Sequence, residues 1–389
     1  MSPQTSPYLP ADAERALLLG RAWRRDTGGP ALVTVRDGAL VDLSHHAATM
    51  AELLDHPQLP HLARHAPGEH LGTITAVLDN TLAATPDLAL PTLLAPCDLQ
   101  AIKACGVTFA VSLLERVIEA QAGGDASRAQ ALRAELHRTI GSDLSAIRPG
   151  SEAAQRLKAE FVARGAWSPY LEVGLGPDAE VFTKAQPMSA VGFGAAVGLH
   201  PDSHWNNPEP EVVLAVNGRS EVVGATLGND VNLRDIEGRS ALLLGKAKDN
   251  NASCAIGPFI RLFDEHFTLD TVRRAEVSLR IEGERDGFVL DGVSRMQEIS
   301  RDPLELVAHA CGPHHQYPDG FMLFLGTMFS PIQDRGAPGA GFTHQLGDRV
   351  TIASPAVGTL VNTVQRSDAL PPWTYGVGAL LRHLRGRDS

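Results

Sequence analysis

The pattern of apolar and polar positions predicts many short strands. Apolar runs in the second half of the chain are brief and are broken by glycine, proline and asparagine. Two such runs flank Asn217-Gly218 in WNNPEPEVVLAVNGRSEVVGATLGNDVNLRD (205–235), and two more flank Asp37-Gly38 in ALVTVRDGALVDLS. Asn-Gly and Asp-Gly favour hairpins because both turn residues tolerate positive φ. A hairpin is therefore predicted at each place.

Helical periodicity occurs in fewer segments. Helices are predicted at about 47–55, in SLLERVIEAQAGG (112–124), at about 125–139, at 152–165 and in DPLELVAHACG. Buried strands are predicted in GVTFAV (106–111) and FMLFLGTMF, and a further hairpin in GDRVTIASPAVGTLVNTV. Strands do not alternate regularly with helices, which indicates an α+β fold with a β-rich core instead of a doubly wound sheet.

A chain of 389 residues is long enough for two domains. Residues 1–90 are predicted to form a small β-containing N-terminal domain. Residues 91–389 are predicted to form a larger catalytic domain, joined to the first by PTLLAPCDLQ. The prolines of HPQLPHLARHAPGEH predict a surface loop, and they make its histidines poor candidates for a metal site.

Charge and composition argue against some classes of partner. The net charge of −11 argues against nucleic acid. No run of about eighteen apolar residues is present, so no membrane-spanning helix is expected, and the N-terminus lacks the pattern of a signal peptide. The four cysteines form no CxxC pair, which fits a reducing compartment and predicts a cytoplasmic protein.

Three carboxylates in the segment 205–235 are candidates for one site. A two-residue turn at Asn217-Gly218 would pair Glu211 with Gly224 and Glu209 with Thr226. Side chains alternate along a strand, so Glu209 and Glu211 share a face, and Asp230 follows the same parity on the partner strand. Asp230 would still lie about 13 Å beyond residue 226. A bend at Gly228-Asn229 is therefore needed to bring the three together.

A cluster of anions needs a compensating charge. Like charges repel at short range, and a buried unpaired carboxylate is costly. An all-oxygen set favours a hard divalent cation such as Mg²⁺, Mn²⁺ or Ca²⁺. From the spacing alone, a solvated strand face with Asp230 in a turn is the simpler interpretation.

The last 290 or so residues resemble the fumarylacetoacetate hydrolase family. The resemblance rests on the order of several short motifs, which are GVTF (106–109), EPE (209–211), GNDVNLRD (228–235), GK (245–246), IGP (256–258), LFLGT (323–327), and GxGF followed by GD (339–342, 347–348). It implies a β-rich mixed-sheet roll or sandwich with peripheral helices, assembled as a homodimer or a dimer of dimers. It also implies that Glu209, Glu211 and Asp230 bind Mg²⁺ or Mn²⁺.

The first motif departs from that of the hydrolytic members of the family. Those members have a pattern like GLNYxxH, in which the histidine activates water. Here Ser112 stands in the place of the histidine, and a serine hydroxyl is a poor general base near neutral pH. With HWNNPEPE and KAKDNNASCAIGP, this variant is similar to 2-keto-3-deoxy-pentonate dehydratases. These convert 2-keto-3-deoxy-D-arabinonate or -xylonate to 2-oxoglutarate semialdehyde.

The implied reaction needs a metal, a base and an acid. Chelation of the 2-keto acid would acidify C3 and stabilise an enolate, and loss of the C4 hydroxyl by β-elimination would follow. Lys246, which follows the apolar run ALLLG, is the candidate proton-transfer residue, with Glu115 as its partner. For Lys246 a structural ion pair is an equal alternative.

Five further residues are candidates for binding the small anionic substrate. Arg234 is one, with an ion pair to Asp235 or Glu237 as the alternative. The others are a backbone N–H at Gly326, the hydroxyl of Thr327, and two residues expected to line the pocket, Phe109 and Ser112.

Two other functions compete with the dehydratase. One is an acylpyruvate hydrolase or oxaloacetate decarboxylase of the same fold, against which the absent histidine counts. The other is a non-catalytic protein that binds Ca²⁺ or an acidic ligand, against which Lys246 and Gly326-Thr327 count, because an ion site alone needs neither.

Overall fold

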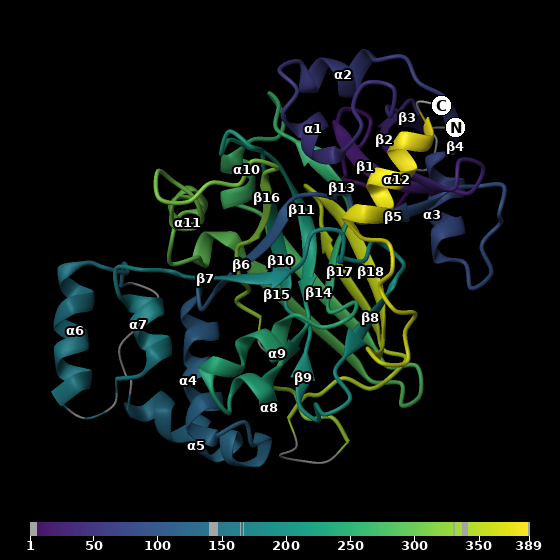
Figure 1. Cartoon of the computed structure of the whole chain (residues 1–389). Helices are drawn as coiled ribbons and strands as arrows, with labels where there is room; N and C mark the ends of the chain where they lie inside the picture. Colours follow the sequence, from purple (N-terminus) through teal and green to yellow (C-terminus); the bar gives the residue numbers. More distant parts are fainter. Residues whose placement is uncertain are drawn as a thin grey trace.

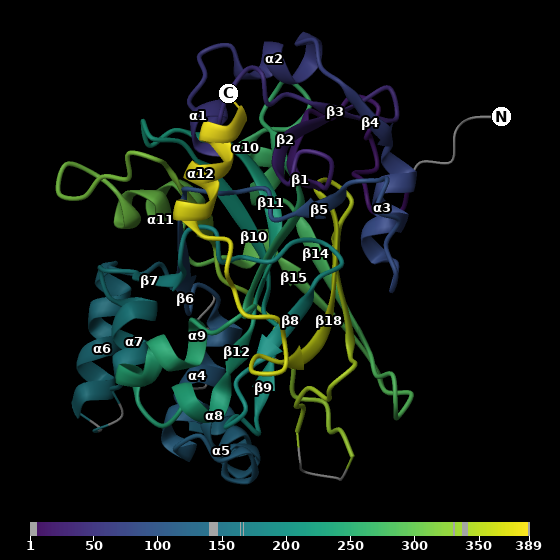
Figure 2. The same cartoon turned by 45° about the vertical axis from the view of Figure 1, so that its right-hand side comes forward.

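The computed structural model describes residues 6–139, 147–163, 165, 167–329, 331–336 and 341–387. Two large sheets pack face to face at its centre, and helices gather in a block at one end (Figure 1). The N-terminal strands lie at the opposite end from this block (Figure 2).

The larger sheet draws strands from most of the chain, in the order β4-β3-β2-β1-β13-β11-β10-β16-β6-β7, with β5 paired to β1. Only β16 and β6 run parallel among the pairs described in this sheet. Its strands are β1 (Leu18–Arg24), β2 (Gly29–Arg36), β3 (Ala39–Asp42), β4 (His70–Thr73), β5 (Thr92–Leu94), β6 (Ala101–Gly106), β7 (Glu180–Ala185), β10 (Pro210–Val216), β11 (Val222–Asp230), β13 (Cys254–Leu262) and β16 (Phe321–Phe324).

The smaller sheets complete the sandwich. A five-stranded sheet has the order β15-β14-β17-β18-β8, and β12 pairs with β9. The strands are β8 (Ala196–Leu199), β9 (Asn206–Asn207), β12 (Asn232–Leu233), β14 (Glu276–Glu282), β15 (Val289–Arg295), β17 (Arg349–Ser354) and β18 (Gly358–Arg366). In β14, buried and exposed residues alternate, as expected for a sheet with one face in the core. The prediction of an α+β fold with a β-rich core is confirmed.

Strand β10 is buried along its whole length because both faces of its sheet are covered. On one face, Val212 and Leu214 pack in a core that includes Leu279 of the five-stranded sheet. On the other face, Val213 packs in a second core with Met50. The helices over that second face are α1 (Met50–Leu54) and α2 (Leu59–His65). The prediction of a loop around residues 56–70 is therefore wrong for α2, where Pro60 sits in the first turn and breaks nothing.

The N-terminal segment and the rest of the chain share one sheet. Leu18 and Leu19 of β1 pair with Arg261 and Ile260 of β13. Arg261 also forms an ion pair with Asp12, at 2.7 Å. Strand pairing thus joins the two predicted domains in one sheet. The division of the chain near residue 90 stays a prediction.

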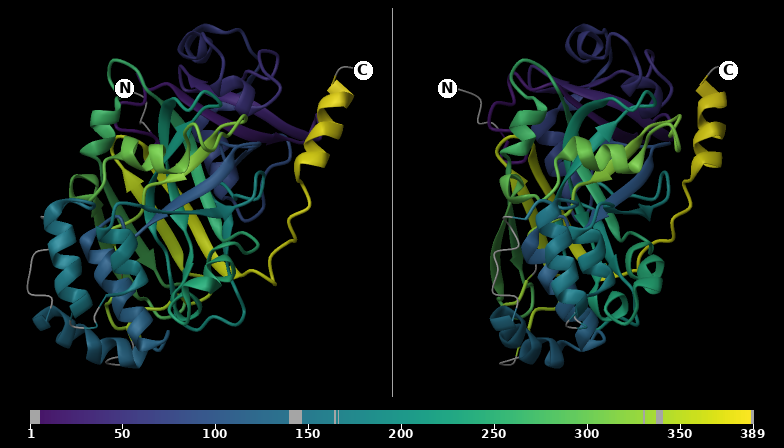
Figure 3. Two further views of the ribbon diagram at one scale, coloured as in Figure 1. Left: turned by 60° about the vertical axis from the view of Figure 1, so that its left-hand side comes forward. Right: turned by 90° about the vertical axis from the view of Figure 1, so that its left-hand side faces the viewer.

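A helical block occupies the chain between β6 and β7 (Figure 3). Because Gly106 pairs with Glu180, the block begins and ends at one point of the sheet. The strand predicted over 106–111 is wrong, since the chain leaves the sheet at Val107, which has a φ of 46°. The predicted helices are confirmed as α4 (Ala110–Ala122), α5 (Ala126–Thr139) and α6 (Glu152–Ala163), followed by α7 (Pro169–Leu175).

The remaining helices are short. They are α3 (Ile74–Leu82), α8 (Arg234–Glu237), α9 (Leu244–Lys248), α10 (Leu269–Arg273), α11 (Pro303–Ala310) and α12 (Val377–Arg387), with 3₁₀ turns η2 (Ala241–Leu243) and η3 (Met296–Glu298). Among the described residues, no helix has both the length and the apolar character needed to cross a membrane.

Candidate metal centre

The hairpin of β10 and β11 places the three predicted carboxylates side by side. Glu211 pairs with Gly228, not with Gly224, so the predicted register is wrong. The chain reverses over a longer loop than a two-residue turn, in which Asn217 N–H donates to the carbonyl oxygen of Glu221 at 3.0 Å. In the observed register the Asp230 N–H donates to the Glu209 carbonyl oxygen at 3.1 Å. Asp230 therefore reaches Glu209 without the bend that the predicted register required.

Glu209, Glu211 and Asp230 are all buried, and each offers an oxygen within 4.8 Å of the others. The prediction that the three carboxylates meet is confirmed. Burial raises the pKa of Glu211 well above its ordinary value, and the charges of Asp230 and Glu209 raise it further. The donor set therefore suits a hard divalent cation, which would relieve this repulsion.

Two buried lysines hold the pKa of Asp230 below its usual value. Burial of Asp230 acts in the opposite direction, but Lys184 and Lys248 outweigh it. The Nζ of Lys248 lies 2.5 Å from Glu209 Oε2 and 3.0 Å from Asp230 Oδ2. On the other side of Asp230, Lys184 Nζ lies 2.7 Å from Oδ1.

Of the two lysines on α9, Lys248 and not Lys246 faces this site. The run ALLLG before Lys246 is largely exposed, and Lys246 Nζ pairs with Asp202 at 2.9 Å, with side chains 41% and 63% exposed. The expectation of a buried Lys246 is therefore wrong, because α9 turns that residue outward and the one two positions later inward. The sequence offered both lysines in KAKD, with no sign of which one faces the site.

The loop after β16 contributes a backbone donor. The Gly326 N–H donates to Glu211 Oε2 at 2.6 Å. Gly326 has a φ of 89°, and a Cβ there would lie 2.1 Å from Thr108 Oγ1, so only glycine brings this N–H to the carboxylate. The Gly326 N–H was expected to bind the substrate, but it binds Glu211, a prospective metal ligand. Thr327 lines the adjoining pocket.

Arg116 adds a third cation from the helical block. It comes from α4, and its Nη2 lies 2.6 Å from Glu209 Oε1 and 3.3 Å from Glu237 Oε2. Although burial lowers the pKa of an arginine, Glu237, Glu119 and Glu209 outweigh it and raise that of Arg116 well above its ordinary value. No motif in the sequence had pointed to Arg116.

A pocket opens over these groups, with two further acidic side chains in its wall. Burial raises the pKa of Glu180, and it raises that of Glu237 to about 7. The lining comprises Cys105, Gly106, Val107, Ser112, Arg116, Glu180, Phe182, Glu209, Glu211, Asp230, Glu237, Lys248, Gly326 and Thr327. Glu180 had no sequence signal, because it belongs to the strand that returns after the helical block.

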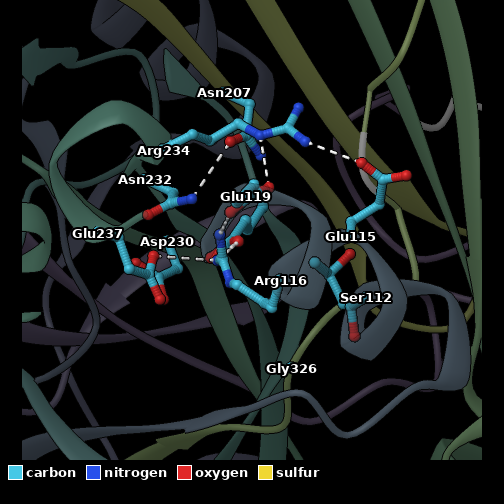
Figure 4. A network of polar contacts seen from close by, with 12 residues as sticks. Ser112, Glu115, Arg116, Glu119, Asn207, Asp230, Asn232, Arg234, Glu237 and Gly326 are labelled. Carbon is cyan, nitrogen blue, oxygen red and sulfur yellow. Dashed lines mark hydrogen bonds and ion pairs between the residues drawn. The ribbon is translucent and has the colours of Figure 1, made fainter. Parts of the chain in front are cut away.

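Three predicted site residues of this region lie outside the pocket lining. Phe109 is buried in the main core. Glu115 and Arg234 are buried and pair with each other at 3.1 Å (Figure 4), and neither lines the pocket. Ser112 does line the pocket, where its hydroxyl donates to the Phe109 carbonyl oxygen at 2.9 Å.

One family model matches the centre of the chain. Residues 177–365 match the family described as fumarylacetoacetate (FAA) hydrolase C-terminal. The matched segment contains the three clustered carboxylates, Lys248 and Gly326. It ends before the C-terminal helix and begins just before β7.

Two curated relatives match about half of the chain. A probable 2-keto-3-deoxyxylonate dehydratase of Haloferax volcanii is 36% identical over 196 residues, which are 50% of this chain and 63% of the relative. A 2-dehydro-3-deoxy-D-arabinonate dehydratase of Saccharolobus solfataricus is 30% identical over 188 residues, which are 48% of this chain and 59% of the relative. The chain thus spans less than two thirds of the length of either relative.

Solved structures share the fold over a longer stretch. The apo form of a 2-keto-3-deoxy-D-arabinonate dehydratase superposes with a TM-score of 0.63 at 20% identity, covering 90% of this chain and 99% of the other. A 2-keto-3-deoxy-D-arabinonate dehydratase complexed with magnesium and 2,5-dioxopentanoate gives a TM-score of 0.62 at 19% identity, with the same coverage. At these identities, the likeness shows a common fold.

Proposed function

We infer the function of this chain from the premise that it belongs to the fumarylacetoacetate hydrolase family, through its residues 177–365. We propose that it is a metal-dependent hydro-lyase that converts 2-keto-3-deoxy-D-pentonate to 2,5-dioxopentanoate, which is 2-oxoglutarate semialdehyde. The arabinonate and xylonate names in the two relatives describe one compound, because C2 and C3 are no longer stereocentres. The buried cluster of Glu209, Glu211 and Asp230 beside Lys248 carries the proposal.

The three carboxylates would hold Mg²⁺ or Mn²⁺. When bound, such an ion supplies Lewis acidity to the carboxylate and ketone oxygens of a 2-keto acid, which acidifies the protons on C3. Gly326 N–H and Arg116 fix the orientation of Glu211 and Glu209 from outside the cluster. These contacts hold the carboxylates in place before a ligand arrives.

Lys248 and Glu180 are the proposed proton-transfer residues, in place of Lys246 and Glu115. The raised pKa of Glu180 keeps its carboxyl group protonated closer to neutral pH, so it is suited to donate a proton to the leaving C4 hydroxyl. Burial alone lowers the pKa of Lys248, but Asp230, Glu209 and Glu237 outweigh it and raise the value. Lys248 therefore becomes a base for C3 only when a cation engages its carboxylate partners.

The pocket wall also offers groups for the rest of the substrate. Ser112 and Thr327 provide hydroxyl groups, and Arg116 provides a positive charge for a small anion. We propose a homodimer or a dimer of dimers in the cytoplasm. The buried free thiols of Cys97, Cys105, Cys254 and Cys311 suit a reducing compartment.

A product assay tests the proposal. Purified protein with Mg²⁺ and 2-keto-3-deoxy-D-arabinonate is expected to yield 2,5-dioxopentanoate, detected by reduction of NAD(P)⁺ in a coupled semialdehyde dehydrogenase reaction. EDTA should abolish turnover, and Glu209→Ala should abolish it with an unchanged circular dichroism spectrum. An inert pentonate combined with consumption of acylpyruvate or oxaloacetate would replace the dehydratase with the hydrolase or decarboxylase of the same fold. Mg²⁺ binding without turnover of any of these acids would favour a non-catalytic binding protein.

A further inference from the structure

Arg234 is a fully buried arginine, and none of its partners lines the pocket. Its side chain is 1% exposed. The Nε lies 2.7 Å from Glu119 Oε1, Nη2 lies 3.1 Å from Glu115 Oε2, and Nη1 donates to the Pro331 carbonyl oxygen at 2.9 Å. The guanidinium also stacks over Trp205, 4.4 Å from the ring centroid. Because its side chain is buried and is absent from the pocket lining, Arg234 is not placed to bind a substrate.

The contacts of Arg234 continue to the metal cluster through α4. One carboxylate oxygen of Glu119 accepts from Arg234 Nε, and the other accepts from Arg116 Nη1 at 2.6 Å. Arg116 Nη2 then reaches Glu209 at 2.6 Å. Figure 4 shows Arg234, Glu119 and Arg116 in this sequence. Four charges of alternating sign thus run from α8 through α4 to a prospective metal ligand.

This chain of ion pairs ties the helical block to the sheet. Arg234 begins α8, four positions after Asp230 at the end of β11, so it moves with the strand that carries a metal ligand. Glu119 and Arg116 belong to α4, which is part of the pocket wall. A shift of α4 would therefore move the Arg116 guanidinium away from Glu209.

We propose that Arg234 is a positioning residue that acts through Glu119 and Arg116 to fix the Glu209 carboxylate and the α4 wall of the pocket. The assignment rests on the proposed function, and it replaces direct binding of substrate by Arg234. Glu115 belongs to a separate branch, since its other partner is Arg133 of α5, at 2.7 Å. That branch does not pass through Arg116.

The test targets Glu119 instead of Arg234. Arg234→Met would remove one of the two arginine partners from each of two buried carboxylates, Glu115 and Glu119, and is expected to impair folding. Glu119→Gln keeps the shape of the side chain and removes the charge that joins Arg234 to Arg116. Arg133→Gln is the matched control. It removes the ion pair between Arg133 of α5 and Glu115 of α4, which is not part of the chain of ion pairs from Arg234 to Glu209. Circular dichroism verifies that each variant is folded.

Two measurements are made on Glu119→Gln, Arg116→Gln and the double variant. They are the Mn²⁺ dissociation constant by titration calorimetry and kcat/KM for 2-keto-3-deoxy-D-arabinonate at saturating Mg²⁺. Glu119→Gln is expected to raise the Mn²⁺ dissociation constant and to lower kcat/KM, each by about 10- to 100-fold, as is usual for loss of a residue that orients metal ligands. In the Arg116→Gln background its effect should disappear, and Arg133→Gln should match the unaltered protein.

An equal effect of Glu119→Gln in both backgrounds would overturn the proposal, because the two residues would then act independently. A lower melting temperature with unchanged Mn²⁺ binding and kcat/KM would also overturn it, since Glu119 would then serve stability alone. If the unaltered protein binds Mn²⁺ but does not turn over the pentonate, the proposed substrate fails, while the Mn²⁺ data still decide the role of the chain of ion pairs.

Discussion

Lys184 and Asp230 form an ion pair of 2.7 Å in which neither side chain reaches solvent, at 0% and 2% exposure. The same Nζ donates to the carbonyl oxygen of Lys248 at 2.6 Å. One lysine therefore holds both a prospective metal ligand and the backbone of the lysine that faces the pocket.

Lys184→Met should destabilise the protein strongly in the absence of metal. The substitution takes one of two lysine partners from the buried Asp230, which keeps only Lys248. Breaking a buried ion pair in this way costs about 3–5 kcal/mol. Thermal denaturation in EDTA measures the loss, and added Mg²⁺ should restore part of it by binding Asp230. Lys103→Met is the control, because Lys103 lies on the neighbouring strand and only donates to Thr183 Oγ1. Equal losses in the two variants would contradict the expected difference.

Glu211→Gln should stabilise the metal-free protein and abolish its response to Mg²⁺. Burial and two neighbouring carboxylates raise the pKa of Glu211, so a neutral side chain relieves a repulsion. The unaltered protein should gain about 2.7 kcal/mol at 100 times the dissociation constant of Mg²⁺. Melting temperatures with and without Mg²⁺ test this, with Glu221→Gln at the exposed end of the hairpin as control. A variant that still responds to Mg²⁺ would remove Glu211 from the ligand set.

Lys248→Ala should lower kcat by about 10²- to 10⁴-fold, as expected for loss of a proton-transfer residue. Lys246→Ala lies two residues away on α9, where its side chain points to solvent, and should keep kcat within about twofold. Steady-state kinetics on the pentonate separate the two. The opposite order would return the role to Lys246.

Gly326→Ala should weaken Mg²⁺ binding and lower stability. The new Cβ would clash with Thr108 Oγ1, and the backbone would shift the N–H that binds Glu211. The positive φ adds about 1–3 kcal/mol of strain. Gly336→Ala has the same φ of 89° but no heavy atom within 4 Å of its Cβ, so it isolates the effect of φ. If both variants bind Mg²⁺ with the same affinity by calorimetry, the Gly326 N–H has no role in the site.

Stability should fall as pH drops below about 7 because of His344. Burial lowers the pKa of His344 below its ordinary value of about 6.5, and the hydrogen bond from Nδ1 to Asp348 at 2.9 Å does not cancel the shift. As pH falls through the pKa of His344 in the unfolded state, the unfolded state binds a proton on His344 before the folded state does. The free energy of unfolding therefore decreases over this range. Burial raises the pKa of Asp348, but the hydrogen bonds from His344 and Arg335 outweigh burial and lower this pKa to about 2. Asp348 therefore stays ionised across this window.

Urea denaturation between pH 7.5 and 5.5 should therefore show a smaller loss of stability for His344→Gln than for the unaltered protein. His314→Gln removes a histidine that is exposed on the surface, and it should behave like the unaltered protein. A loss of the same size in His344→Gln would assign the pH dependence to other groups.

The carboxylate cluster could be predicted from sequence because parity survives an error in register. Moving the partner of Glu211 from Gly224 to Gly228 is a shift of an even number of positions, so Asp230 keeps the same face. The length of the loop was not predictable from Asn217-Gly218 alone. Asn217 accepts from the N–H groups of Arg219 and Glu221 and so stabilises a wider reversal.

The groups around the cluster could not be predicted from local patterns. Arg116 lies on the first helix of the helical block and Glu180 follows its last helix, and the two come together only because β6 pairs with β7. Lys248 was missed because a helix of five residues has no periodicity long enough to show its buried face. Arg234 was identified as important, but its partners Glu115 and Glu119 lie on a helix far away in sequence.

Pairing with β1 gives hydrogen-bond partners to an edge of β13 that would otherwise be exposed. β13 lies beside β11, the strand that ends in Asp230, and on its other side β1 pairs with it at Ile260 and Arg261. Without residues before 90, β13 would present an unpaired row of N–H and C=O groups, a template for association with strands of other molecules. By pairing with that edge, the N-terminal segment is expected to limit association through the sheet that carries the carboxylates, although it contributes no side chain to the pocket lining.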